Sequence, residues 1–307
     1  MDPNGIHVQA ASNIIFLCGG QRSDLSVPTP LSLRDAFLKV VDNPILKNRD
    51  LVQAEDITEA FSFFDIYADI LEFEIDIAQI VELIILFSES EGSLAELGAF
   101  AMTEEIAAHL FVIVREKHWK KSSFVRLGPL RRIEGRHGRG AIFIVEDKVV
   151  GMQGDSAAKV DKNLLVDLLK KPISERLAKP SEPSTFDASR SGHVIKLVVG
   201  LVQEYGALQI AEILELLKII GVGKTEQDVR RYLLCAEAIG WVVQISKGTC
   251  DYYVAKANKS DAATILSKKE AEIRNKQRRR IAIREYWERE DPQRHRAMLE
   301  GARGISI

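Results

Sequence analysis

Leu83-Ile84-Ile85-Leu86-Phe87, Ser88-Glu89-Ser90-Glu91-Gly92 and Ser93-Leu94-Ala95-Glu96-Leu97-Gly98 are three consecutive stretches that decide the fold. The five apolar residues predict a strand that is buried on both faces. The polar residues predict a loop, and the segment from Ser93 to about Glu105 predicts a helix. A buried strand, a loop and a helix in this order are typical of α/β proteins with a parallel sheet.

The rest of the N-terminal half repeats this alternation. Further strands are predicted at Ile14–Cys18, at Leu110–Val114 and, more weakly, at 141–145, with Val149-Val150 as a related short segment. Helices are predicted near 31–42, 60–80 and 160–178. The fold class is therefore α/β with an open, mostly parallel sheet. Because ligands bind at the carboxyl ends of such strands, Gly19-Gly20 and the loop Ser88–Gly92 are expected on one edge.

The pattern changes after a linker at 179–184. Helices at 193–205, 210–220 and 225–239 precede a hairpin at 241–255, which predicts a winged-helix-like domain. A charged helix is expected from Lys268 to about Asp291-Pro292. The chain is thus divided into three parts, residues 1–178, 190–258 and 259–307.

Composition limits the class of protein. The chain has 307 residues, a net charge of -2 and three scattered cysteines, which favour a reducing compartment over a disulfide framework. No apolar run reaches the ~20 residues of a membrane helix, and no Cys/His spacing suggests a metal site. A cytoplasmic protein with no membrane contact is expected. From Lys268 to Arg303 there are 12 Lys/Arg and 7 Asp/Glu, so nucleic-acid contact is expected at the C-terminal end.

Glu96 has two interpretations. Ser93 and Glu96 are three residues apart, so Glu96 could accept from the Ser93 backbone N–H as a capping box. The alternative is chemistry, because Gly92 lets a ligand approach the backbone and the first-turn N–H groups would hold a sugar hydroxyl or phosphate. Gly98 costs the helix ~1 kcal/mol relative to Ala, which predicts close packing there.

Several motifs resemble known families. Gly92-Ser93-x-x-Glu96-Leu97-Gly98-Ala99 resembles the nucleoside 2-deoxyribosyltransferase fold, in which the glutamate is the nucleophile. More specifically, residues 12–133 resemble effector proteins of retron antiphage systems. That resemblance rests on four motifs, which are Ile14-x-Phe16-Leu17-Cys18-Gly19-Gly20, Glu55-Asp56, Ile84 to Phe100, and Ser123-Phe124-x-x-x-Gly128-Pro129. Glu82 and Ser88 stand where these proteins usually have Asp and Pro.

The resemblance implies a toxin with N-glycosidase activity. NAD or a free nucleotide would be the substrate, with no cofactor and no metal. A retron reverse transcriptase and its RNA-linked DNA (msDNA) would control the toxin, and a homo-oligomer or higher assembly is expected. The implied substrate-binding residues are Cys18, Gly19, Gly20, Gly92 and Ser93.

Each of the other polar residues near the motif has two possible roles. Glu89 would contact the base or ribose, or is a solvated loop charge. Asp56 or Glu55 would supply the general acid, or favours a helix N-terminus electrostatically. Glu74 would orient Glu96, or faces water. Ser123, Gly128 and Pro129 form loop architecture, or Ser123 binds a phosphate.

Basic residues in the C-terminal part are candidate nucleic-acid contacts. Those on the third helix are Lys224, Gln227, Arg230 and Arg231, that at the wing tip is Lys247, and those in the tail are Arg278, Arg279 and Arg280. The alternatives are a protein-docking module and a solvated helix. At the level of function, the alternatives to the toxin are a nucleotide-sensing DNA-binding regulator without turnover and, less favoured, a nucleoside salvage enzyme.

Overall fold

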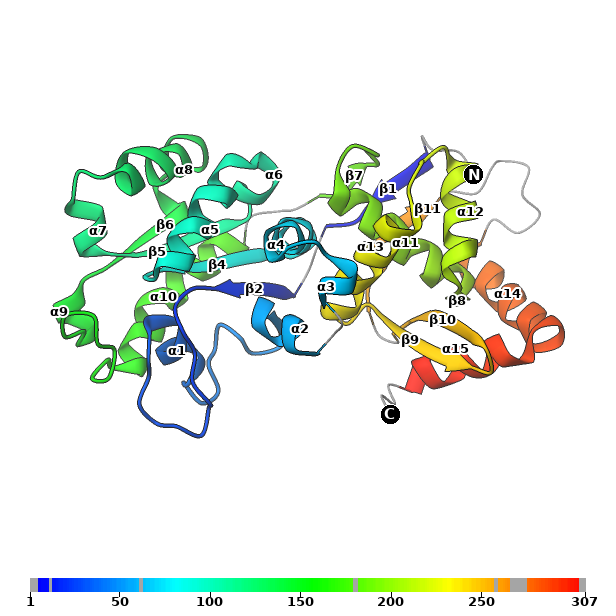
Figure 1. Cartoon of the computed structure of the whole chain (residues 1–307), viewed down its shortest axis with the longest axis horizontal. Helices are drawn as coiled ribbons and strands as arrows, with labels where there is room; N and C mark the ends of the chain where they lie inside the picture. Colours follow the sequence, from blue (N-terminus) through cyan, green and yellow to red (C-terminus); the bar gives the residue numbers. More distant parts are fainter. Residues whose placement is uncertain are drawn as a thin grey trace. The chain divides into compact units, whose positions relative to one another are not determined.

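The computed structural model describes residues 5–10, 13–60, 63–178, 182–256, 259–265 and 275–303 (Figure 1). These residues form two compact units. The sheet unit contains residues 12–56 and 81–180, and the second unit contains residues 1–11, 57–80 and 181–307. The segment 57–80, which the sequence analysis assigned to the N-terminal part, is therefore grouped with the C-terminal half.

The sheet unit is built on a parallel sheet, as predicted, and β3 (Asp50–Val52) is a fifth strand that the sequence did not predict. The order of the strands is β3, β2 (Ile14–Cys18), β4 (Leu83–Ser88), β5 (Leu110–Arg115) and β6 (Ile142–Val145). Every residue of β2, β4 and β5 is buried, which explains why continuous apolar runs encode them. Strand order reverses between β2 and β4, because β3 lies beyond β2 and β5 lies beyond β4.

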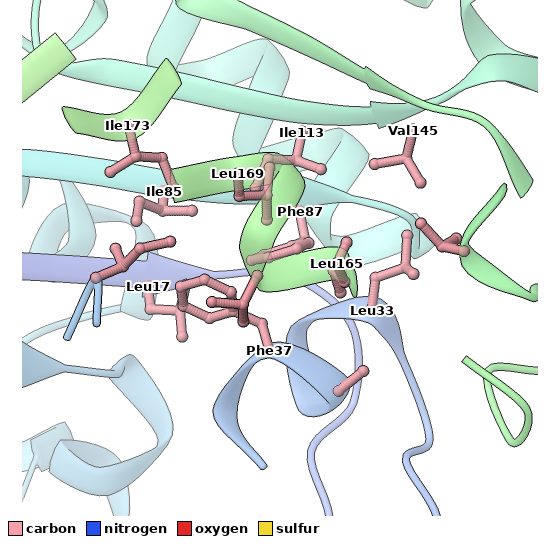
Figure 2. Packing of buried hydrophobic residues seen from close by; sticks show 14 of the residues in the cluster. Leu17, Leu33, Phe37, Ile85, Phe87, Ile113, Val145, Leu165, Leu169 and Ile173 are labelled. Atoms are coloured by element: carbon pink, nitrogen blue, oxygen red, sulfur yellow. The ribbon is translucent and has the colours of Figure 1, made fainter. Parts of the chain in front are cut away.

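Helices cover both faces of this sheet. On one face, α1 (Leu33–Leu38) and α10 (Lys162–Leu177) supply Phe37 and Leu165 to a core with Leu17 and Phe87 (Figure 2). On the other face, α5 (Glu91–Met102) brings Phe100 to 6.5 Å from Phe16, ring centroid to ring centroid. Helix α1 is shorter than the predicted 31–42 because its C-cap is Lys39.

The remaining elements of the sheet unit are short. They are α6 (Glu104–Ala107), α7 (Glu116–Lys120), the π-helix η2 (Arg126–Leu130), α8 (Arg131–His137), the 3-10 helix η3 (Arg139–Ala141) and α9 (Asp147–Val150). Val149 and Val150 thus belong to a helical turn, and the interpretation of this dipeptide as strand-like is wrong.

The C-terminal half contains the predicted helices and hairpin. The helices are α11 (Ser191–Tyr205), α12 (Ile210–Ile220) and α13 (Glu226–Ala238), and the antiparallel sheet is β8 (Ala207–Leu208), β10 (Cys250–Ala255) and β9 (Val242–Lys247). Thr225 caps α13 in a capping box with Asp228, as expected. In the tail, α14 (Lys276–Glu290) ends before Asp291 and α15 (Pro292–Arg303) follows, while Lys268, Lys269 and Arg274 lie outside the described residues.

One feature of the second unit was not predicted. A further antiparallel sheet has β1 (Ile6–Val8) between β11 (Ala263–Ile265) and β7 (Ser184–Thr185). The segment 60–80 is helical, as predicted, and contains α3 (Phe63–Ile66) and α4 (Ile70–Ala78), while α2 (Ala54–Ala60) comes just before it. Within the described ranges, no helix is long and apolar enough to cross a membrane.

Candidate functional site

The carboxyl ends of β2 and β4 form the reversal point of the parallel sheet. The strands pair in register, with Cys18 opposite Leu86. The loops that follow them meet, as expected, because a Cβ at Gly20 would lie 2.8 Å from Glu89 Oε1. Reversal points of open α/β sheets are where such folds bind ligands.

Gly19 is required by the backbone at this edge. Its φ of +150° is a value that side-chain-bearing residues rarely adopt, and a Cβ there would lie 2.7 Å from the Cβ of Phe87. Cys18, the last residue of β2, is buried. These two predicted substrate-binding residues therefore shape the first loop, and Gly20 packs against Glu89.

Glu89 holds the two loops together. Its carboxylate accepts from the backbone N–H groups of Leu33 (2.7 Å) and Arg34 (3.0 Å), at the start of α1. Burial raises the pKa of Glu89, while the N–H donors of Arg34, Leu33 and Gly20 lower it. Both carboxylate oxygens accept hydrogen bonds from backbone N–H groups, so Glu89 joins the two loops. The alternative that it is a solvated loop charge is wrong.

The start of α5 differs from the prediction in a way that matters for Glu96. The helix begins at Glu91, and Ser90 is its N-cap. Ser90 Oγ accepts from the Ser93 N–H (3.2 Å), and Ser93 Oγ accepts from the N–H groups of Ser90 (2.8 Å) and Glu89 (3.0 Å). The capping box is therefore Ser90 with Ser93. The capping interpretation of Glu96 is wrong, and Ser93 is buried in the cap.

Glu96 has the properties of a functional carboxylate. Its Oε2 atom is buried and has no hydrogen-bonding partner among the described residues. The pKa of Glu96 is raised to about 7. Burial is the main cause, the positive charge of Arg34 opposes the rise, and the negative charge of Glu55 adds to it. A desolvated acid at the carboxyl edge of a parallel sheet, with one oxygen buried and unpartnered among the described residues, is typical of a functional site.

Arg34 was missed from the sequence. It is only 2% exposed, and its Nη2 donates to Glu55 Oε1 at 2.6 Å. Its Nε is buried without a partner in the described structure. A lone Arg between the apolar positions Leu33 and Phe37 was the available signal, because a buried guanidinium needs an anion.

The Glu55-Asp56 pair separates into two environments. Glu55 lies with Arg34 and adds its charge to the field at Glu96. Asp56 instead forms an ion pair with Arg22 (2.5 Å) and accepts from Gln53 (3.1 Å), with its side chain half exposed. Of the two, Glu55 is the carboxylate associated with Glu96.

Three other residues, Gly92, Gly98 and Glu74, were expected to take part in this site. A Cβ on Gly92 would meet open space, which is consistent with a ligand approaching the backbone. A Cβ on Gly98 would also meet open space, so the close packing predicted there is wrong. Glu74 is 6% exposed, so it does not face water, and it lies in the second unit.

On α13, the predicted nucleic-acid contacts are only partly available. Gln227 donates to the carbonyl of Ile66 (2.5 Å), and Arg231 pairs with Glu72 (3.1 Å). These two side chains are used where α3 and α4 pack against α13. Arg230 is exposed and pairs with Glu226 on its own helix (2.6 Å), and Lys224 lies near the Tyr232 ring.

The tail residues are also largely paired within the second unit. Arg279 and Arg280 both donate to Glu204, which is 7% exposed, and Arg280 also donates to Asp261. Lys247 Nζ lies 2.6 Å from a carboxylate oxygen of Glu300. Arg278 is exposed. Helix α14 is therefore tied to the unit by the ion pairs of Arg279 and Arg280, while Arg278 is open to solvent.

The fold is that of an open parallel α/β sheet with a desolvated glutamate near its reversal point, the edge at which proteins of this class bind ligands. A family model described as the STM3845 retron effector protein matches residues 30–244. The chain belongs to this family of retron effectors.

Two curated proteins of Escherichia coli are similar to the chain. One, from retron Ec73, is 27% identical over 234 residues, which are 72% of this chain and 70% of the relative. The other, from retron Ec86, is 33% identical over 150 residues, which are 49% of this chain and 46% of the relative. The name of each proposes a ribosyltransferase and DNA-binding protein.

Proposed function

We propose that the sheet unit is an N-glycosidase domain of the nucleoside deoxyribosyltransferase type, with NAD or a free nucleotide as substrate. The observation that carries this proposal is the buried, unbonded Oε2 of Glu96 at the reversal point of the sheet. The names of the two relatives, which propose ribosyl transfer, support the same class of chemistry.

In the proposed reaction, ionised Glu96 attacks the anomeric carbon of the ribose. A bond forms between the carboxylate oxygen and that carbon, and the carbon–nitrogen bond breaks with its electron pair going to the base. Nicotinamide leaves NAD as a neutral molecule, whereas other bases need a proton. The oxygen of a water molecule then bonds to the same carbon, the bond to Glu96 breaks with its electron pair returning to the carboxylate, and the sugar leaves while one proton of the water passes to solvent.

Neighbouring residues support Glu96 in this scheme. Arg34 favours its ionised form, and Glu89 holds the two loops that bound the ligand. Of Glu55 and Asp56, Glu55 is the candidate donor of a proton to a leaving base, because its charge is the one that acts on Glu96. Both carboxylates are ion-paired, Glu55 with Arg34 and Asp56 with Arg22. The open space beside Gly92 admits the sugar or its phosphate to the start of α5.

We further propose that the C-terminal half is a winged-helix-like module that binds msDNA and the retron reverse transcriptase. The candidates that remain after Gln227, Arg231, Lys247, Arg279 and Arg280 are assigned to contacts within the unit are the exposed Arg230 and Arg278 and the half-buried Lys224. The protein would act in the cytoplasm as an antiphage toxin, as a homo-oligomer or higher assembly, restrained by these partners.

The test is NAD consumption by purified protein, with and without the proteins and msDNA co-expressed from its own locus. Wild type should release nicotinamide, Glu96→Gln should not, and Glu91→Gln, an exposed position on the same helix, should behave as wild type. If NAD is stable, a panel of nucleotides is tested in the same way. Tight nucleotide binding without turnover in every preparation would overturn the enzyme and favour the sensor.

A further inference from the structure

A second charged region lies in the sheet unit, outside the residues assigned so far. Residues 115–140 contain nine Lys/Arg and two Asp/Glu, a net charge of +7. The rest of the chain therefore has 33 Lys/Arg and 42 Asp/Glu. This segment is more strongly basic than the tail, where the sequence analysis placed nucleic-acid contact.

Ion pairs remove part of this charge but not the excess. Three acidic residues from outside the segment pair with it, namely Glu104, Asp147 and Asp155. Counting them leaves nine basic against five acidic groups. Lys121 and Arg131 are exposed and form no ion pair with any described residue. The surface therefore keeps positive charge that has no counterpart within the described part of the protein.

The basic side chains gather around Trp119. The guanidinium carbons of Arg126 and Arg139 lie 3.7 and 4.6 Å from the centre of its ring. Both arginines also pair with Glu134. These contacts bring α7, η2, α8 and η3 together as one surface, which follows directly from β5 and so begins at the carboxyl edge of the sheet (Figure 1).

An exposed aromatic ring lies within this basic surface. Phe124 is 84% exposed, although it stands in a folded segment beside the π-helix. Three of its ring atoms lie 3.5 to 3.6 Å from where a Cβ of Gly128 would be, so the ring rests over the glycine. Leu127, next to Gly128, is also 54% exposed. One side of the Phe124 ring therefore rests on Gly128, and the rest of the ring is open to solvent.

We propose that this surface, made of Lys121, Phe124, Arg131, Arg139 and their neighbours, binds a single-stranded polynucleotide. Lysine and arginine neutralise phosphates along the strand, and a supported aromatic ring stacks on an unpaired base. Duplexes offer phosphates but no free base face, so the exposed Phe124 favours a single strand. This site is separate from the C-terminal residues proposed above and needs no turnover.

The experiment measures binding of fluorescein-labelled oligothymidylate and of oligouridylate to the full chain by fluorescence anisotropy, over a range of salt concentrations. Phe124→Ala should weaken binding roughly fivefold or more, as loss of one stacked base does. The plot of the logarithm of the binding constant against the logarithm of the salt concentration has a slope that counts the neutralised phosphates. The double charge reversal Lys121→Glu/Arg131→Glu should reduce the magnitude of this slope by about 1.4, which corresponds to two phosphates on a single strand. Which of the two oligonucleotides binds more tightly distinguishes DNA from RNA as the natural strand.

Lys170→Glu/Lys171→Glu is the matched control, because it reverses two exposed charges on α10 in the same unit. It should bind both oligonucleotides as wild type does. The proposal is overturned if Phe124→Ala and Lys121→Glu/Arg131→Glu bind like this control. It is also overturned if duplex DNA binds as tightly as the single strand and Phe124→Ala has no effect, or if only an acidic polypeptide such as polyglutamate binds the surface.

Discussion

Replacing Glu96 by glutamine is expected to abolish turnover and, at the same time, to stabilise the folded protein above pH 7. The reason is the free-energy cost of keeping a charged carboxylate in a desolvated position where its Oε2 has no hydrogen bond with any described residue. Glutamine has nearly the same shape as the protonated acid and carries no charge. The variant therefore removes the cost but keeps the packing.

The magnitude follows from the pKa of Glu96. The ordinary value is 4.5, and burial raises it to about 7 in the folded protein. Below pH 4.5 the acid is neutral in both folded and unfolded chains, so the wild type pays no penalty. As pH rises through 7, Glu96 ionises in the folded protein as well, and the free energy of unfolding of the wild type falls. The fall is at most ~3 kcal/mol, at 1.36 kcal/mol per unit of pKa difference. Solvent near the side chain reduces the expected gain of the variant to about 1–2 kcal/mol.

Urea unfolding of wild type and Glu96→Gln at one pH below 4.5 and one above 7 measures this difference. Glu91→Gln is the control, and should give no gain because that side chain is exposed and its charge favours the helix N-terminus. Equal unfolding free energies of wild type and Glu96→Gln above pH 7 would show that Glu96 is solvated. The physical argument for its role would then fail, whatever the effect on activity.

Two further predictions concern the neighbours of Glu96. In wild type, kcat/KM should rise as pH passes about 7, since attack needs the ionised carboxylate. Arg34→Met should move this rise to higher pH by removing a favourable positive charge, and an unchanged pH profile would exclude that influence. Glu89→Gln should lower the unfolding free energy by about 1–3 kcal/mol, because it weakens the bonds to the N–H groups of Leu33 and Arg34. Urea unfolding checks this, and stability equal to wild type would mean that these bonds are dispensable.

The sequence was most informative where burial on both faces imposed a simple pattern. Strands β2, β4 and β5 have no polar alternation, so their apolar runs and the loops after them could be located. Strands β1, β7 and β11 have two or three residues each and pair across the chain, and no local pattern encodes such partners. Local signals identify elements, whereas long-range pairing depends on the whole fold.

The candidate site shows the same division. Glu96 could be identified from its motif, but the position of the N-cap could not. Ser90 and Ser93 are both serines and lie three residues apart, so either side chain suits an N-cap, and the structure places the cap at Ser90. Arg34 could not be placed beside Glu96, because 62 positions of chain separate them and only the β2–β4 pairing brings their loops together. Likewise, nothing local to α13 indicates that Gln227 and Arg231 bond to residues of α3 and α4.

The sheet around β1 has a consequence for the order in which the protein is made. His7 pairs with Thr264, and the Gln9 side chain donates to Thr264, a partner 255 positions later. Every residue of the sheet unit precedes residue 181, so all of its core is synthesised before β11, the partner of β1. A nascent chain therefore carries a complete Glu96 edge well before the second unit is finished. Any restraint that depends on that unit arrives later in synthesis than the chemistry it would restrain.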